Sequence, residues 1–442
     1  MGCGRILVRA AGGSTLEHET HRRGSAARPS PMPQGRAGNR SVPEVAGRWV
    51  VFVFSPMVFD AIHTRKHAMV ECFSRLGFES VFVERPNSNS RYHAGRGAPK
   101  LNSRIFRMEP PQTQFVLEDG RGVLCVPKKI GIGPLRVFVG RRRQERLQAR
   151  WLEKFFARLG ARSGKRHLAI VACARWEPLL RNIPFDLLVF DKTDPPESLR
   201  GWLPEREYLE RERALIERST LVLSPSETLL SSVRSHHPDV RMFVVPNGVD
   251  SRYFEAHRGD PVPELEDARR PVAGFLGSIA PWVDISLLVA CAKAYPSWTF
   301  PIVGPLDNRV DPSPLLGLPN VKFWGEVPYH RVPAIMEAFD VALMPFVPGP
   351  VSDAANPVTL YEFLYLGKPV VLSPMSQLER FSPLLYMSRE NFIANLRLAA
   401  EERDQVLREK RRQVGLRHGW DGLVEEMLVE LRLTDPIAVT RP

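Results

Sequence analysis

The segment NPVTLYEFLYLGKPVV, residues 356–371, predicts a short helix that is followed directly by a buried strand. Gly367 is a residue type that ends helices, and the proline two positions later prevents the helix from continuing. The helix begins just beyond the preceding apolar strand, residues 341–346, so its free N–H groups face a space where phosphate groups bind readily. Three apolar residues have the i, i+3, i+4 spacing of a buried helix face: Leu360, Phe363 and Leu364.

Glu362 is the one carboxylate in the first turns of this helix. At that position it can accept hydrogen bonds from sugar hydroxyl groups. The alternative is that the side chain only complements the positive end of the helix dipole. The pattern by itself leaves both interpretations open.

The pattern N-P-x-x-L-Y-E-x-L-x-x-G-K-P-V-V resembles the donor-site segment of retaining, nucleotide-sugar-dependent glycosyltransferases with the GT-B fold, of the family-4/group-1 type. The nearest resemblance is to the branch of teichuronic-acid-type polysaccharide synthesis. It implies that Glu362 holds the nucleotide ribose. Many members have a second glutamate eight residues earlier, where this chain has Ala354, so the usual pair of glutamates is broken. The resemblance also implies that the preceding loop and first turn bind the donor: Asn356, Pro357, Val358, Thr359 and Leu360.

Length and composition narrow the class of protein. A chain of 442 residues with 43% hydrophobic and 25% charged residues has room for two or three globular domains. Its five cysteines lack C-x-x-C spacing, which argues against a disulfide framework or a zinc site and favours a reducing compartment. No run approaches 18 apolar residues, so we expect no transmembrane helix. The net charge of +12 indicates anionic partners without choosing among them.

The chain divides into four predicted parts. Residues 1–47 are rich in Gly, Ala, Ser, Pro and Arg and are predicted to be a disordered extension. Residues 48–245 are predicted to form an acceptor-side Rossmann-like domain, because a strand, a helix and a second strand follow one another within about 35 residues. Residues 246–415 are predicted to form the nucleotide-sugar-binding Rossmann-like domain. Residues 416–442 resemble the terminal helix and tail that cross back to the first domain.

Acceptor-side catalytic candidates come from loops at the carboxyl ends of the first domain's strands, where ligands of such sheets bind. Asp60 and His63 follow the first strand, and Asp194 follows a later one. For His63 the alternative is a loop histidine without a special role. We assign no firm catalytic base, because the resemblance implies that the donor phosphate itself can accept the proton.

The second domain contributes further donor-site candidates. Gly277 and Ser278 follow its first strand, where a glycine lets a diphosphate approach the backbone. The family generally has basic phosphate ligands just after this strand, whereas this chain has Trp282 and Asp284. Val327 lies in a turn that resembles the one contacting the nucleotide base through backbone groups; the alternative is a simple β-turn.

A basic amphipathic helix is predicted within residues 141–166, because apolar residues recur every four positions and arginines and lysines fill much of the rest. One interpretation is a core-packed helix with a solvated basic face. A second is contact with an anionic membrane surface, where lipid-linked acceptors reside. No recognition motif or base-stacking array supports nucleic-acid binding.

The predicted fold is α/β GT-B, with two doubly wound Rossmann-like domains facing across a cleft. The resemblance implies retaining transfer of a sugar from a UDP- or GDP-sugar to a glycan or lipid-linked acceptor in cell-surface polysaccharide synthesis. We expect no metal and no cofactor besides the donor substrate, and a cytoplasmic protein at the inner face of the membrane. The alternatives are a non-catalytic binding subunit and a nucleotide-sugar epimerase or phosphorylase on the same fold.

Overall fold

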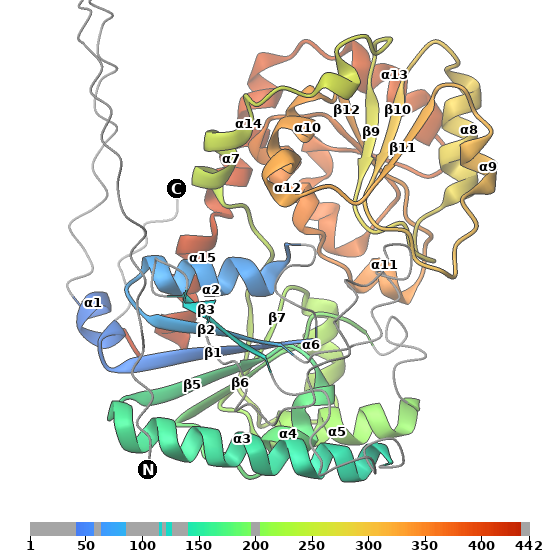
Figure 1. Cartoon of the computed structure of the whole chain (residues 1–442). Helices are drawn as coiled ribbons and strands as arrows, with labels where there is room; N and C mark the ends of the chain where they lie inside the picture. Colours follow the sequence, from blue (N-terminus) through green and yellow to red (C-terminus); the bar gives the residue numbers. More distant parts are fainter. Residues whose placement is uncertain are drawn as a thin grey trace, which may run out of the picture. The chain divides into compact units, whose positions relative to one another are not determined.

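The computed structural model describes residues 41–56, 63–84, 115–116, 121–125, 140–195 and 204–434, which belong to one compact unit. These residues form two separate sheets, each covered by helices (Figure 1). Neighbouring strands are parallel throughout, apart from one antiparallel pair at the edge of the first sheet, β3 and β4.

The first sheet has eight strands in the order β3-β4-β2-β1-β5-β6-β7-β8. Their bounds are β1 Trp49–Ser55, β2 Glu79–Glu84, β3 Phe115–Val116, β4 Arg121–Cys125, β5 Arg166–Val171, β6 Leu187–Asp191, β7 Leu221–Ser224 and β8 Met242–Val244. The helices that accompany this sheet are α1 Ser41–Ala46, α2 Arg65–Arg75, α3 Arg141–Ser163, α4 Glu177–Leu180, α5 Glu205–Arg218, α6 Glu227–Arg234 and α15 Trp420–Glu430.

The apolar run of β1 explains why helices cover both faces of this sheet. All seven residues of the strand are buried. Successive side chains of a strand point to opposite faces, so Val51 and Val53 join the core under α1, α2 and α15. Phe52 and Phe54 join the opposite core, under α3, α4, α5 and α6 (Figure 1). A strand with six consecutive apolar residues, Trp49 to Phe54, has to be covered on both faces.

The second sheet is entirely parallel and has the order β11-β10-β9-β12-β13-β14. Its strands are β9 Ala273–Leu276, β10 Phe300–Val303, β11 Val321–Gly325, β12 Val341–Met344, β13 Val370–Leu372 and β14 Tyr386–Met387. Its helices are α7 Ser251–His257, α8 Ile285–Ala294, α9 Ser313–Leu316, α10 Val332–Ala338, α11 Pro350–Ala354, α12 Val358–Tyr365, α13 Phe392–Glu401 and α14 Gln405–Arg417.

The chain passes between the two sheets twice, and the two passages lie side by side. Val249 N donates to His418 O at 3.0 Å, and Trp420 N donates to Val249 O at 3.2 Å. The contact requires a glycine, because a Cβ at Gly248 would lie 2.2 Å from His418 O. After the second passage, α15 packs against α2 and the first core, so the last helix stabilises the first sheet.

The structure confirms the predicted α/β fold with two doubly wound sheets. The limits of the predicted domains stay a prediction. Residues 1–40 of the predicted extension lie outside the described residues, as does Asp60. For Ser41–Ala46 the expectation of disorder was wrong, because these residues form α1 and bury Val42 and Ala46 against the first core.

Candidate active site

A cavity of about 280 Å³ lies at the carboxyl ends of strands from both sheets. The first sheet contributes residues 64–66 at the start of α2, residues 193–195 after β6, and Asn247. The second sheet contributes Trp282 after β9 and residues 355–358 before and within α12. Ligands of parallel sheets bind at this kind of edge, so the cavity is the candidate active site.

The start of α12 opens into this cavity without a side-chain cap. Its N-cap is Pro357, and Leu360 N donates to Pro357 O at 3.2 Å. Within the described part of the chain, the N–H groups of Val358 and Thr359 donate no hydrogen bond. Uncapped N–H groups and the helix dipole together attract an anion.

Asn356 connects the two halves of the site. Its Oδ1 accepts from Asn247 N at 2.9 Å, its carbonyl accepts from Asn247 Nδ2, and its Nδ2 donates to the Tyr361 hydroxyl at 2.9 Å. Both polar atoms of the Asn356 side chain are therefore already bonded. Asn356 thus fixes the loop before α12 to Asn247, which lies on the segment that leads from the first sheet to the second.

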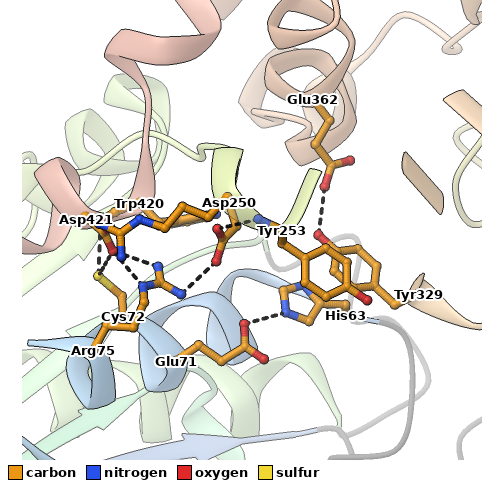
Figure 2. A network of polar contacts seen from close by, with 11 residues as sticks. His63, Glu71, Cys72, Arg75, Asp250, Tyr253, Tyr329, Glu362, Trp420 and Asp421 are labelled. Carbon is orange, nitrogen blue, oxygen red and sulfur yellow. Dashed lines mark hydrogen bonds and ion pairs between the residues drawn. The ribbon is translucent and has the colours of Figure 1, made fainter. Parts of the chain in front are cut away.

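Glu362 is buried, with 3% of its surface exposed. Burial raises the pKa of its carboxyl group to about 8, and the one opposing contribution is a hydrogen bond from the Tyr329 hydroxyl. That hydroxyl donates to Glu362 Oε1 at 3.3 Å (Figure 2). A buried carboxylate with one weak donor still has capacity to accept hydrogen bonds from a ligand.

Tyr329 is at the centre of an aromatic stack that the sequence did not predict. Its ring lies 3.9 Å from the His63 ring at an interplanar angle of 9°, and 4.9 Å from the Tyr253 ring. His63 Nε2 in turn lies 3.2 Å from Glu71 Oε2 (Figure 2). The one available signal was an aromatic residue two positions after Val327, the predicted base-contacting turn.

The two acceptor-side candidates that the structure describes, His63 and Asp194, lie in different surroundings. His63 belongs to the aromatic stack, whereas Asp194 lines the cavity and accepts from Thr193 Oγ1 at 2.6 Å. Asp191, the last residue of β6, is fully buried, and both of its oxygens contact Arg65 Nε, at 3.2 and 3.0 Å. Asp191 is thus engaged in an internal ion pair.

The remaining donor-side candidates lie away from the cavity wall as far as the described residues define it. Gly277 N donates to Val303 O at 2.9 Å, so that N–H is not free for a phosphate. Ser278 and Val327 are half-buried, and Leu360 is buried in the core that the second sheet forms with α10, α12 and α14. Among the predicted donor-site residues that the structure describes, the backbone N–H groups that remain available to a phosphate at the cavity are therefore those at the start of α12.

The two departures from the family pattern have structural roles. Ala354 is 2% exposed and ends α11. Asp284 caps α8, accepting from Leu287 N at 3.0 Å, and pairs with Arg389 at 2.9 Å. Among the described residues, no three His, Cys, Asp or Glu side chains are grouped as a metal-ligand set.

The basic helix predicted within residues 141–166 is α3. Leu152 and Phe156 are buried against the first sheet. On the opposite face, the exposed side chains are almost all cationic: Arg141, Arg142, Arg143, Arg146, Arg150, Lys154 and Arg158. Of these, Arg141 pairs with Glu207, and the others have no carboxylate partner within the described residues. No described helix is long and apolar enough to cross a membrane.

Sequence comparison identifies a relative among glycosyltransferases. The chain is 32% identical over 200 residues to the "Putative teichuronic acid biosynthesis glycosyltransferase TuaH" of Bacillus subtilis (strain 168). The match covers 42% of this chain, and the chain spans half the length of that relative. No protein-family model matches the chain.

Comparison with solved structures extends over most of the chain. Sucrose-phosphate synthase of Thermosynechococcus elongatus has a TM-score of 0.62 at 15% identity, covering 87% of this chain and 98% of that one. Anabaena Alr3699/HepE in complex with UDP has a TM-score of 0.56 at 12% identity, covering 87% and 99%. An α,α-trehalose-phosphate synthase (UDP-forming) from Burkholderia xenovorans has a TM-score of 0.57 at 10% identity, covering 87% and 100%. The chain therefore has the GT-B fold, and it is similar to glycosyltransferases both in sequence and in structure.

Proposed function

We propose that this protein is a glycosyltransferase that moves a sugar, with retention, from a nucleoside-diphosphate sugar to a glycan or lipid-linked acceptor. The observation that carries the proposal is the uncapped start of α12, which opens into the cavity, with the buried Glu362 in the same helix. The similarity to TuaH supports a role in cell-surface polysaccharide synthesis. The UDP bound by the Anabaena neighbour supports UDP as the first donor nucleotide to test.

The chemistry needs stabilisation of a departing diphosphate. In the proposed complex, the N–H groups of Val358 and Thr359 bind the phosphate oxygens whose charge increases as the glycosidic bond breaks. These donors are fixed by the helix before the reaction begins, so little reorganisation is needed in the transition state. The proton of the acceptor hydroxyl passes to the donor phosphate, as the family resemblance implies.

Glu362 is proposed to accept hydrogen bonds from the ribose hydroxyls. Because Tyr329 donates to the same carboxylate, the ribose would replace or join that hydroxyl. On the acceptor side, Asp194 is proposed to orient the acceptor hydroxyl, since its carboxylate lines the cavity. His63 stacks on Tyr329, which donates to Glu362, so the proposal gives His63 the role of holding Tyr329 and not of contacting the acceptor. No cofactor besides the donor substrate enters this proposal.

A thermal-shift panel of UDP, GDP, ADP and dTDP tests the donor site. A ligand that binds only the folded state at a hundredfold excess over its Kd stabilises it by about 2.7 kcal/mol. We expect one nucleotide to raise Tm for the wild type and to lose this effect in Glu362→Ala. Glu266→Ala is the matched control, because Glu266 is exposed and lies outside the cavity. If no nucleotide shifts the wild type, the proposed donor site is wrong.

A second candidate function is a non-catalytic binding subunit of the same fold. Two observations favour it: the position of the first acid is a buried alanine, Ala354, and Asp284 is engaged in a cap and an ion pair where basic ligands are usual. Nucleotide binding without sugar transfer to any acceptor would support this function. Turnover of the sugar nucleotide without an acceptor would instead indicate an epimerase or phosphorylase.

We further propose that the protein is cytoplasmic and that the basic face of α3 contacts an anionic membrane surface. Each basic residue near such a surface contributes about 1 kcal/mol, an effect that salt weakens. The triple variant Arg146→Gln, Arg150→Gln and Lys154→Gln should lose co-sedimentation with phosphatidylglycerol vesicles. A control with Arg206→Gln and Arg213→Gln on α5 should retain it, because each of those arginines already pairs with a glutamate. Equal binding to phosphatidylcholine vesicles would contradict the electrostatic mechanism.

A further inference from the structure

All the positive side chains on the wall of the cavity, within the part of the chain that the structure describes, come from the start of α2. Arg65 and Lys66 line the cavity from this side. The wall residues from the second sheet are uncharged, including Trp282, Asn356 and Val358. The second sheet supplies no positive side chain to the cavity wall, and the two cations face the cavity from the first sheet.

Arg65 is held in place by buried hydrogen bonds and an ion pair. It is 3% exposed, and its Nε contacts both oxygens of Asp191. Its Nη1 donates to Val245 O at 2.8 Å, to Pro246 O at 3.0 Å and to Asn247 Oδ1 at 3.2 Å. The buried Nη2 has no partner among the described residues. Because Asn247 is bonded to the loop before α12, Arg65 links the starts of α2 and α12.

Lys66 differs from Arg65, because no carboxylate pairs with it within the described residues. The contact found for Lys66 Nζ is a long one, 3.4 Å, to Thr193 Oγ1. The charge of Arg65 is balanced by Asp191. Lys66 is therefore the cation on this wall that is free to move toward a bound anion, and its half-buried position reduces screening by solvent.

We propose that Lys66 binds the diphosphate of the donor from the side opposite to the N–H groups of Val358 and Thr359. This inference rests on the proposed function and names a residue that the family pattern does not contain. A lysine ammonium is a compact charge on a flexible stem, suited to follow phosphate oxygens as their charge grows. The first sheet would thereby contribute directly to stabilising the leaving group, and not only to holding the acceptor.

The test compares nucleotide and nucleoside binding in Lys66→Met and Lys66→Arg by calorimetry. The probes are UDP, GDP, ADP and dTDP, each paired with its nucleoside. Loss of one charge-assisted contact should weaken diphosphate binding by about 10- to 100-fold in Lys66→Met. Nucleoside binding should stay unchanged, and Lys66→Arg should restore most of the diphosphate affinity. The control Lys293→Met removes an exposed lysine of α8 outside the cavity and should bind as the wild type does.

The outcomes separate this proposal from the proposed function. If Lys66→Met binds the diphosphate as tightly as the wild type while Glu362→Ala does not, the donor site stands and the role of Lys66 is wrong. Equal weakening of diphosphate and nucleoside in Lys66→Met also overturns the proposal, because the variant would then have disturbed the whole site. If the wild type binds none of the four nucleotides, the proposed function is wrong, and the role of Lys66, which rests on it, is wrong as well.

Discussion

Replacing Glu362 by glutamine is expected to remove a pH dependence of folding stability that the wild type has near neutrality. The Glu362 carboxyl is buried, and burial raises its pKa from the ordinary 4.5 to about 8. A carboxyl group with a raised pKa binds more protons in the folded state than in the unfolded state between these two values. The wild type is therefore expected to lose stability as pH rises through this window.

The size of the effect follows from the shift. Each pKa unit corresponds to about 1.36 kcal/mol, so the raised pKa lowers the free energy of unfolding by about 3 kcal/mol at pH 7 and by about 5 kcal/mol well above pH 8. Below pH 4.5 the group is neutral in both states and the cost disappears. The amide introduced by Glu362→Gln has no proton to lose in this range, so the variant lacks this contribution at every pH.

Urea denaturation of both proteins at half-unit steps from pH 4.5 to 8.5 measures the difference. We expect the free energy of unfolding of the wild type to fall by about 3–4 kcal/mol more than that of the variant between pH 5 and pH 8. A saturating nucleotide should reduce this difference, because ribose hydroxyls stabilise the ionised carboxylate. Parallel pH profiles of the two proteins would refute the argument, since Glu362 would then titrate near its ordinary pKa.

Three further predictions concern the surroundings of the site. Tyr329→Phe removes the hydrogen bond that lowers the pKa of the buried carboxylate, so the pH dependence just described should extend to higher pH in the same urea experiment. Asp191→Asn leaves the buried Arg65 charge unpaired and should lower the free energy of unfolding by about 3–5 kcal/mol; adding Arg65→Met should recover part of that loss. Gly304→Ala should destabilise the fold by about 1–3 kcal/mol or more, because φ is +138° and the new Cβ would lie 1.9 Å from a backbone oxygen; Gly317→Ala, with open space around its Cβ, should melt nearly as the wild type does.

Local patterns in the chain were enough to predict the elements that build the site. The strand, helix and second strand predicted after residue 48 are present as β1, α2 and β2, in a sheet with helices on both faces. The apolar spacing before Gly367 predicted α12, and Gly367 has a φ of +71°, which suits the end of a helix. These predictions succeed because hydrogen bonds within a helix and alternation along a strand depend on neighbours in the sequence.

The contacts that define the candidate site depend on residues far apart in the chain. Arg65 meets Asp191 across 126 positions, and Asn247 meets Asn356 across 109. Asp191 is the last residue of β6, at the sheet edge where ligands bind, and only the packing of α2 shows that its charge is already balanced. The family resemblance drew attention to missing cations near Trp282, whereas Arg65 and Lys66 line the cavity from the side of the first sheet.

The order of residues along the chain was sufficient to identify the two α/β units, the short helix with its glutamate and the resemblance to GT-B glycosyltransferases. The chemical state of that glutamate required the three-dimensional packing. Burial raises the pKa of Glu362 to about 8, and the hydrogen bond from Tyr329, which stacks between His63 and Tyr253, opposes that rise. The pKa of a side chain depends on the solvent and the charges around it in space. These surroundings come from segments far apart in the sequence, and no local sequence pattern shows that the segments are in contact.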